Sequence, residues 1–565
     1  MRYIMEQKWW QNQVAYQIWP KSFCDSDGDG IGDIQGIINR LDYLKELGIG
    51  ILWISPMYCS PLADEGYDIS DYYNIDPRFG NLVNFDILLL EARARNIRII
   101  MDLVVNHCSD EHEWFRKACE DPDGAYGKYF YIRNRDGEHL PTNWRSYFGG
   151  SVWEPLPGHP DKVYLHYFHK KQPDLNWENP ELREEIYRMM NWWMDRGISG
   201  FRIDAIMNIR KPEIFHDYPA DRDDGLCSLR NALHDQMDVK LYLNEMRDKV
   251  FLPHDAFTVG EVFDHDPEAL EEFIGSRGCF SSMFDFSGEI FNRSKNGWYE
   301  DPAFLTPDQY KECIFRAQLT VKDKGFLSNI IENHDEPRGV SRYLPQTFAD
   351  VHTPAAKKAL AGTYFLLRGI PFIYQGQELG MENVPFSSME EISDCSTIDQ
   401  YKVALAAGLS EEEALAAIGP LSRDNARTLF PWDGSENGGF TTGTPWTKPH
   451  PAYTDTNAAA QCKDPDSVLN FYKKLSALHH DPEYGSVLCQ GEFLPFLEEQ
   501  SNLIAYYRWN GIRTILVLAN FQPECQNVEL PEKNYHPILI NEGSLHFYDQ
   551  TLTLLGWQFC VLEVT

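Results

Sequence analysis

Gly200-Phe-Arg-Ile-Asp-Ala205 is the stretch on which the interpretation of this chain depends. An apolar β-pattern that starts near Gly197 ends in Arg202 and Asp204, two opposite charges separated by one residue. A carboxylate at the tip of a buried strand is costly unless it is paired or used in chemistry. Taken alone, this arginine and aspartate fit a structural strand cap as well as a catalytic pair.

Seven further apolar runs resemble this strand, and amphipathic stretches lie between most of them. Eight strands separated by helical crossovers predict an α/β fold, a parallel (β/α)8 TIM barrel. We expect strands at 14–19, 51–55, 97–105, 198–203, 256–261, 279–284, 327–332 and 372–374, and helices at 34–47, 85–95, 181–194 and 355–366.

Two breaks in this alternation predict additions to the barrel. The gap between the third and fourth strands predicts an inserted domain at 108–175, rich in Tyr, Asp, Gly and Trp. A Gly- and Asn-rich excursion, 380–465, follows the eighth strand and contains a short helix at 411–418. Residues 482–565 show β-propensity without a long helix, which predicts a C-terminal antiparallel β-sandwich. The barrel then comprises 1–107 and 176–481.

Composition narrows the range of partners. The net charge of −34 disfavours nucleic acid and anionic membranes, because both are themselves negative. No apolar run reaches about 20 residues, and the N-terminus lacks a signal-peptide pattern. The 12 cysteines show no CxxC pair and are expected to be reduced thiols. We therefore expect a cytoplasmic protein with no membrane partner, a monomer or weak homo-oligomer.

Charged residues recur where the predicted strands end. In a parallel barrel these ends share one rim, and the active site lies there. Polar caps could account for any one of them, but stability does not require charge at so many strand ends. The residues are Asp102, His107, Arg202, Asp204, Glu261, His334 and Asp335.

Carboxylates beside a cation suit cleavage of a glycosidic bond, which needs one proton donor and one nucleophile or electrostatic stabiliser. Arg202 is expected to keep Asp204 ionised, while acidic neighbours raise the pKa of Glu261. A metal-dependent hydrolase is the weaker alternative, since no HxxxH or HxH pair accompanies the carboxylates.

Four motifs make a family resemblance specific. They are Asp102-Leu-Val-Val-Asn-His107, Gly200-Phe-Arg-Ile-Asp204, Thr258-Val-Gly-Glu261 and Asn333-His-Asp335. In order and spacing the chain resembles glycoside hydrolase family thirteen, the α-amylase superfamily, in its oligo-1,6-glucosidase and α-glucosidase branch. The resemblance implies Asp204 as nucleophile, Glu261 as acid/base and Asp335 as transition-state stabiliser. It implies sugar contacts in the −1 subsite from His107, Arg202 and His334.

Further segments resemble the oligo-1,6-glucosidase branch. Gln172-Pro-Asp-Leu-Asn176 and Asp64-Glu-Gly-Tyr-Asp68 are two of them, and Ser422-Arg-Asp-Asn-Ala-Arg427 is a third. The resemblance implies that Asp64 pairs with Arg427, Tyr67 stacks on the sugar, and Phe168 and Gln172 line the pocket. A pocket closed by such an ion pair implies exo action, although sequence spacing alone favours an ordinary surface ion pair.

Asp25-Ser-Asp-Gly-Asp-Gly-Ile-Gly-Asp33 is an acidic loop after the first predicted strand. Oxygens at alternating positions suit a hard cation, and the glycines permit a tight turn. It lacks the final Glu of an EF-hand, and a solvated acidic turn is the alternative. The resemblance implies a structural Ca²⁺ or Mg²⁺ there and no organic cofactor. The expected ligands are Asp25, Asp27, Asp29, the Ile31 carbonyl and Asp33.

The sequence therefore predicts a retaining, exo-acting α-glucosidase that releases α-glucose from short α-glucoside oligosaccharides. Isomaltose-type α-1,6 bonds are favoured, with maltose and sucrose possible substrates. Ala205 stands where α-1,6-specific relatives usually carry Val and many α-1,4-specific ones Thr, which leaves linkage preference open. Trehalose-6-phosphate hydrolase, sucrose hydrolase and transglucosylase activities remain alternatives, as does an inactive carbohydrate-binding homologue.

Overall fold

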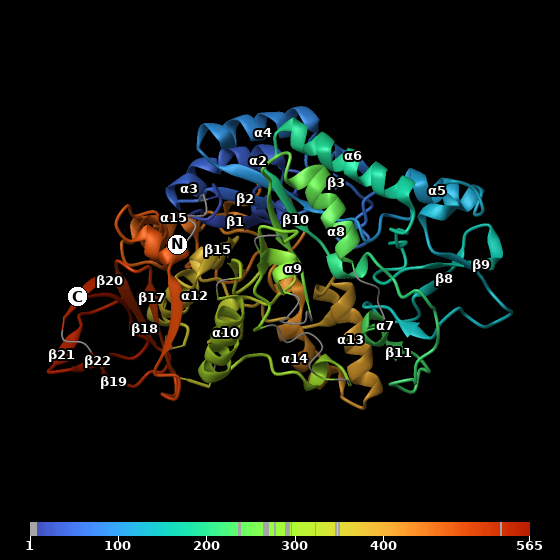
Figure 1. Cartoon of the computed structure of the whole chain (residues 1–565). Helices are drawn as coiled ribbons and strands as arrows, with labels where there is room; N and C mark the ends of the chain where they lie inside the picture. The colour runs from blue at the N-terminus through green and yellow to red at the C-terminus, as the bar shows by residue number, and fades with distance from the viewer. Residues whose placement is uncertain are drawn as a thin grey trace.

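The computed structural model describes residues 8–234, 239–263, 270–275, 278–288, 294, 296–322, 324–344, 347–348, 351–531 and 534–565. Eight parallel strands close into a barrel in which each strand pairs with the next and the last returns to the first (Figure 1). They are β1 Ala15–Ile18, β2 Ile51–Ile54, β5 Arg98–Leu103, β10 Gly200–Ile203, β12 Phe257–Gly260, β13 Ser282–Phe284, β14 Leu327–Asn329 and β15 Gly369–Tyr374. All eight lie within or overlap the predicted runs, so the predicted barrel is confirmed.

Helices cover the outside of the barrel. The principal ones are α2 Ile34–Asn39, α3 Leu41–Glu46, α4 Leu82–Ala94, α6 Pro180–Arg196, α8 Lys240–Met246, α9 Leu270–Ile274, α10 Pro307–Val321, α12 Pro354–Phe365 and α16 Val468–His479. The helix predicted at 34–47 is in fact two, since the backbone of Arg40 leaves the helical region at φ −109° and ψ 3°. Shorter helices are α1 Pro20–Phe23, α7 Leu229–His234, α11 Gly339–Tyr343, α15 Ala458–Lys463 and α17 Gly485–Gln490.

Local sequence signals explain how the fourth barrel strand, β10, is positioned. Asn179 caps α6 by accepting the amide of Glu181, Pro180 occupies the first turn, and Gly197 ends the helix with φ 118°. Gly200 then opens β10 at φ 152°, where a Cβ would lie 1.7 Å from the carbonyl oxygen of Phe257. Only glycine allows β10 to approach β12 this closely, and that approach sets the positions of Arg202 and Asp204.

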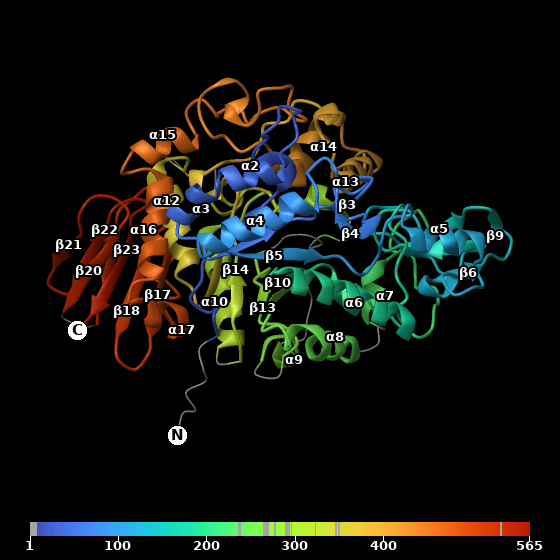
Figure 2. The same cartoon turned by 90° about the horizontal axis from the view of Figure 1, so that it is seen from above.

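The chain leaves the barrel after β5 and builds a separate sheet at one end of the molecule, the cyan region of Figures 1 and 2. The order of this antiparallel sheet is β6 Ile132–Asn134, β9 His159–Leu165 and β8 Trp153–Leu156, with α5 Glu113–Glu120 beside it. Bridges from His107 to Asp174 and from Phe130 to Leu175 bring the chain back to the rim. The small strands β7 Trp144–Arg145 and β11 Cys227–Ser228 join this region to the segment after β10. The domain limits predicted from the sequence stay predictions.

The C-terminal residues form two antiparallel sheets at the opposite end of the molecule (Figure 2). The first contains β16 Glu492–Phe496, β17 Leu503–Trp509, β18 Thr514–Asn520, β23 Phe559–Val564 and β20 Tyr535–Ile540, and the second β19 Gln526–Glu529, β22 Thr551–Leu554 and β21 His546–Tyr548. Their apolar faces share one core, as the alternating sequence predicts.

Two insertions lie over the rim. The hairpin β3 Tyr58–Cys59 and β4 Asp71–Ile75 follows β2, and the helices α13 Cys395–Ala406 and α14 Glu411–Ile418 follow β15. Both carry residues to the site described below. No helix in the described parts of the chain combines the length and the apolar character needed to cross a membrane.

Candidate active site

Three carboxylates converge on one buried arginine at the rim. Arg202 Nη1 donates to Asp102 Oδ1 at 2.7 Å and to Asp204 Oδ1 at 2.6 Å, and Nη2 donates to Glu261 Oε1 at 2.6 Å. The barrel register explains the cluster, because β10 pairs with β5 on one side and with β12 on the other. The acids that the sequence places at separate strand ends are therefore neighbours.

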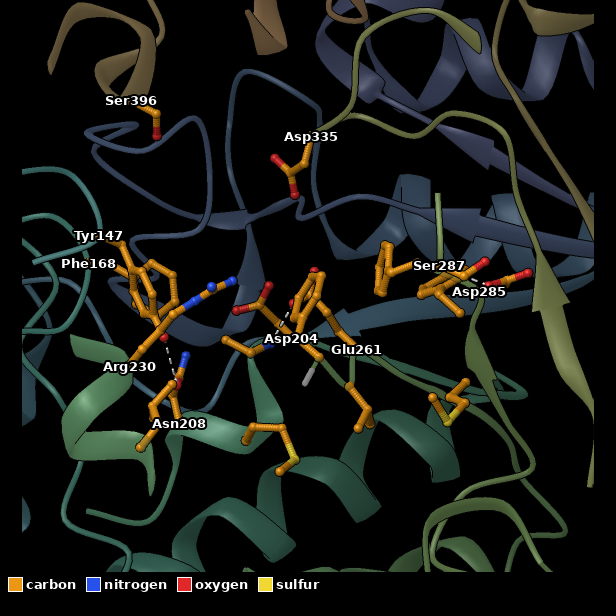
Figure 3. Close-up of a pocket in the computed structure, with 18 of the residues that line it drawn as sticks. Tyr147, Phe168, Asp204, Asn208, Arg230, Glu261, Asp285, Ser287, Asp335 and Ser396 are labelled. Carbon is orange, nitrogen blue, oxygen red and sulfur yellow. Dashed lines mark hydrogen bonds between the residues drawn. The ribbon is translucent and has the colours of Figure 1, made fainter. Parts of the chain in front are cut away.

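A second group faces this cluster across a cavity (Figure 3). Asp335 accepts His334 Nε2 at 3.0 Å, Arg427 Nη2 at 3.0 Å and Arg423 Nη1 at 3.2 Å. The His334 ring lies between two aromatic rings, Trp19 and Tyr67, each 5.3 Å away at its centroid and nearly parallel to it.

These surroundings shift the pKa values of Glu261 and Asp335 in opposite directions. Burial and the neighbouring Asp335 and Asp102 raise the pKa of Glu261 above its usual range, although Arg202 opposes this. For Asp335 burial acts upward, but His334, Arg423 and Arg427 lower its pKa well below the usual range. One carboxyl is therefore poised to hold a proton, while the acid opposite it stays ionised.

The expectation that Arg202 keeps Asp204 ionised by lowering its pKa is wrong. Burial, followed by the charges of Glu261 and Asp102, raises the pKa of Asp204 well above its usual range despite Arg202. The reason is that one guanidinium is shared among three carboxylates. Because Asp204 and Glu261 share that one cation, ionising both carboxyls at once is costly.

One end of the cavity is closed by charged side chains. Arg423 Nη2 lies 3.4 Å from Asp64 Oδ1 and 2.7 Å from Asp394 Oδ1. The predicted pairing of Asp64 with Arg427 is thus wrong: Arg427 lies four residues further along the chain and reaches Asp335 instead. Gln172 Nε2 donates to Asp64 Oδ2 at 3.0 Å and fixes that carboxylate from the other side.

The cavity has a volume of about 570 Å³, and most of the predicted residues line it. Four other predicted residues lie behind the wall, and each is bonded to a side chain that lines the cavity: Arg202, His334, Gln172 and Arg427. The residues of the predicted set on the wall itself are Asp64, Tyr67, His107, Phe168, Asp204, Glu261 and Asp335.

Several wall residues were not predicted from the sequence. Phe263 and Phe286 stack with centroids 4.4 Å apart beyond Glu261. Arg423 lies in the same Ser422–Arg427 segment as Arg427, so the segment correctly predicts an arginine partner for Asp64 but not its position. Phe263 follows Glu261 by two residues and could have been found by extending the strand pattern. Asp285 directly follows β13, so the rule that charges end strands could have found it. Other wall residues carry no such signal: Tyr147 and Phe148 lie in a loop, Trp298 in a short 3-10 helix, and Ser396 and Gln400 in α13.

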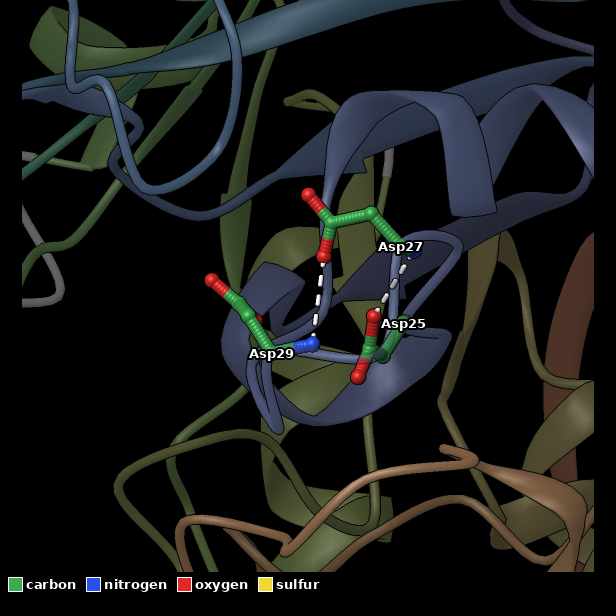
Figure 4. Close-up of side chains that lie close together, drawn as sticks. All are labelled: Asp25, Asp27 and Asp29. Carbon is green, nitrogen blue, oxygen red and sulfur yellow. Dashed lines mark hydrogen bonds between the residues drawn. The ribbon is translucent and has the colours of Figure 1, made fainter.

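The acidic loop after β1 brings together three of the five expected metal ligands (Figure 4). Carboxylate oxygens of Asp25, Asp27 and Asp29 lie within 4.8 Å of one another. Burial and the charges of Asp27, Asp25 and Asp33 raise the pKa of Asp29, because like charges lie close together there. Asp33 lies outside this group and instead caps α2 by accepting the amide of Gly36. The three clustered carboxylates fit a hard cation such as Ca²⁺ or Mg²⁺, and none of them belongs to the cavity wall.

A closed barrel with paired acids and an ionised third carboxylate at its carboxyl rim defines the class of barrel glycoside hydrolases. Residues 17–484 match the family described as "Alpha amylase, catalytic domain". This match covers most of the chain, which therefore belongs to the α-amylase family.

Similar proteins carry more specific names. An oligo-1,6-glucosidase of Halalkalibacterium halodurans is 41% identical over 96% of this chain and 94% of its own length. A trehalose-6-phosphate hydrolase of Bacillus subtilis (strain 168) is 38% identical, covering 91% of this chain and 90% of its own. Among solved structures, the trehalulose synthase MutB of Pseudomonas mesoacidophila MX-45 superposes with a TM-score of 0.91 at 36% identity, over 99% of this chain and 100% of that one.

Proposed function

We propose that the chain is a retaining, exo-acting α-glucosidase that releases α-glucose from the non-reducing end of short α-glucosides, with α-1,6 bonds preferred. The observation that carries the proposal is the shared guanidinium of Arg202, which holds Asp204 and Glu261 side by side. Retaining glycosidases need a nucleophile and an acid/base about 5–5.5 Å apart, whereas inverting enzymes leave room for a water molecule.

In this mechanism Asp204 attacks the anomeric carbon while Glu261 protonates the leaving oxygen. Glu261, now ionised, removes a proton from water, and the water displaces Asp204 with overall retention. Positive charge that develops on the sugar is stabilised by the ionised Asp335 across the cavity. Contacts from Tyr67 and His107 would hold the terminal glucose during both steps, while His334 orients Asp335 from behind the cavity wall.

The Asp64–Arg423 pair supports exo action. A charged wall at one end leaves space for a terminal sugar and blocks a chain that continues past it. The preference for α-1,6 bonds rests on the Gln172–Asn176 segment and on the names of the relatives. A structural cation in the Asp25–Asp33 loop belongs to the same proposal.

One substrate panel tests the proposed function. Isomaltose, maltose, sucrose, trehalose and trehalose-6-phosphate are supplied separately, and initial glucose release and the anomer first formed are measured. We expect fastest release from isomaltose, with α-glucose appearing first. Release of β-glucose first would overturn the retaining mechanism, and a clear preference for trehalose-6-phosphate would replace the proposed substrate.

The nucleophile is tested by Asp204→Asn. Turnover should fall by several orders of magnitude, since removing a group of this kind costs about 10⁴-fold or more, while binding of isomaltose by calorimetry persists. Asp195→Asn on α6 is the matched control, because the Asp195 side chain is 76% exposed and lies outside the cavity wall. Near-normal hydrolysis by Asp204→Asn would refute the assignment, and sugar binding by a wild-type protein without turnover would favour an inactive homologue.

A further inference from the structure

A buried ion pair lies behind His107, one of the cavity-lining residues. Lys211 Nζ is 2.6 Å from Asp174 Oδ2, and both side chains are fully buried. Lys211 Nζ also donates to Asn106 Oδ1 at 2.9 Å and to the carbonyl oxygen of Asn208 at 2.6 Å. Three acceptors around one nitrogen match the three hydrogens of an ammonium group. Burial lowers the pKa of Lys211, and Asp174 opposes that shift.

This pair fixes the orientation of the Asn106 side-chain amide. An ammonium can only donate, so the atom of Asn106 facing Lys211 is the oxygen. A carboxylate can only accept, and Asp174 Oδ1 lies 3.3 Å from Asn106 Nδ2. Lys211 and Asp174 therefore both require the same orientation of the Asn106 amide. In that orientation Asn106 Nδ2 faces His107 Nδ1 at 3.1 Å. Since that amide nitrogen is a donor, His107 Nδ1 has to accept.

The other ring nitrogen of His107 faces an acceptor. His107 Nε2 lies 3.1 Å from the carbonyl oxygen of Tyr67, a contact that requires a proton on Nε2. Burial lowers the pKa of His107 to about 3, so the ring is neutral and carries one proton. One contact favours the opposite tautomer, since Gln172 Nε2 lies 3.1 Å from His107 Nε2. The Nε2–H tautomer is still favoured over this one contact. In the Nδ1–H tautomer, His107 Nδ1–H would face the donor Asn106 Nδ2, and the Tyr67 carbonyl would lose its donor.

We propose that Lys211 and Asp174 are positioning residues that act through Asn106 to hold His107 as the Nε2–H tautomer. Nε2 lies on the side of Asp64 and Tyr67, which line the cavity, whereas Nδ1 faces the buried Asn106. The single Nε2–H therefore donates to the Tyr67 carbonyl and fixes the Asp64–Tyr67 segment, whose side chains line the cavity, against the segment that follows β5. The effect of this contact on catalysis rests on the proposed function, but the tautomer itself does not.

The first experiment measures the tautomer without substrate. The full-length protein is labelled with ring-¹⁵N histidine, and the His107 signals are assigned by their loss in His107→Gln. We expect Nδ1 unprotonated and Nε2 protonated throughout about pH 5 to 8, where free imidazole titrates. A protonated Nδ1, or a ring that becomes charged in this range, would overturn the inference even if the enzyme hydrolyses isomaltose. Conversely, the expected spectrum in a protein inactive on every α-glucoside would refute only the proposed function.

The second experiment reverses the hydrogen-bond polarity. In Asn106→Asp the side chain offers oxygens to both Lys211 and His107, so Nδ1 has to donate. We expect the ¹⁵N spectrum to invert, and kcat/KM for isomaltose to fall roughly tenfold as the Tyr67 carbonyl loses its donor and Tyr67 shifts on the cavity wall. Asn39→Asp on the exposed end of α2 is the matched control and should change neither readout. A folded Asn106→Asp with an unchanged spectrum contradicts the proposal.

Variants of the lysine separate positioning from simple structural support. Lys211→Arg keeps a group that only donates, and should retain the wild-type tautomer even if stability falls. Lys211→Met removes the donor and should give a mixed spectrum with lower kcat/KM. If Lys211→Met keeps the pure Nε2–H tautomer, the lysine has no positioning role. Should either variant fail to fold, the wild-type spectrum and Asn106→Asp still decide the question.

Discussion

At the scale of single residues, Arg202 is bonded to Asp102, Asp204 and Glu261, and this sharing controls how the proposed catalytic pair titrates. The folded protein raises the pKa of Glu261, so it disfavours the ionised form relative to the unfolded chain. Stability linked to this group is complete below the unfolded pKa of about 4.3 and is lost as pH rises through the folded pKa.

Glu261→Gln should therefore gain stability relative to the wild type as pH rises. We expect the difference in Tm, variant minus wild type, to grow between about pH 4 and 7, since each unit of pKa shift corresponds to about 1.4 kcal/mol. Calorimetry across that range checks the prediction. Glu499→Gln, at an exposed turn, should show a constant difference. A constant difference for Glu261→Gln as well would show that its raised pKa does not limit stability.

A double-mutant cycle tests which arginine closes the cavity. Asp64→Asn combined with Arg423→Gln should deviate from additivity in kcat/KM by about 1 kcal/mol, because the two side chains are in contact. Asp64→Asn combined with Arg427→Gln should be closer to additive, since Arg427 is bonded to Asp335 instead. Stronger coupling to Arg427 would restore the pairing predicted from the sequence.

At the scale of elements, the Asp25–Asp33 loop is hydrogen-bonded to residues 441–446, which follow β15 in the sequence. Thr441 Oγ1 donates to Asp25 Oδ2 at 2.5 Å, and the amide of Trp446 donates to the Gly30 carbonyl at 3.0 Å. A cation bound by the three clustered aspartates would neutralise their repulsion and strengthen the link between β1 and the residues after β15.

We expect a chelator to lower Tm by a few degrees and added Ca²⁺ to restore it, because ligands that bind only the folded state stabilise it. Asp27→Asn combined with Asp29→Asn should remove this response. Both side chains are exposed, so the substitutions should leave folding intact, and Asp123→Asn on another exposed loop is the control. A Tm independent of chelator and Ca²⁺ would leave the loop as an acidic turn.

The elements of the fold were largely predictable from the sequence, because apolar runs, glycines and helix caps are local signals. The break at Arg40 was not, since 34–47 keeps its apolar period across it. For the site, charges that end strands could be recognised because the barrel rule brings strand ends together. The choice between Arg423 and Arg427, and the stacking of Phe263 on Phe286, depend on how loops pack against each other. The sharing of Arg202 among three acids likewise depends on distances between strands.

At the scale of the whole molecule, the C-terminal sheets are fastened to the barrel by a buried arginine. Arg508 on β17 is fully buried, and its Nη1 donates to the Leu366 carbonyl at 2.6 Å while Nη2 donates to the Gly491 carbonyl at 2.8 Å. Leu366 ends α12, and Gly491 ends α17. One side chain thus satisfies the terminal carbonyl groups of two helices, one from the barrel and one that leads into the first C-terminal sheet.

Arg508→Met keeps much of the side-chain volume and leaves both carbonyl groups without this donor. Each buried group left unsatisfied costs about 1–3 kcal/mol, so we expect Tm to fall by several degrees. Arg508 lies outside the cavity wall, and kcat per folded molecule should therefore stay at the wild-type value. Arg513→Met, in the turn before β18, is the control, because Arg513 forms partly exposed ion pairs with Glu483 and Glu563, which contribute little. Equal destabilisation by the two variants would show that the helix-end contacts of Arg508 do not hold the sheets to the barrel. A loss of kcat in Arg508→Met would show that the C-terminal sheets also shape the active site.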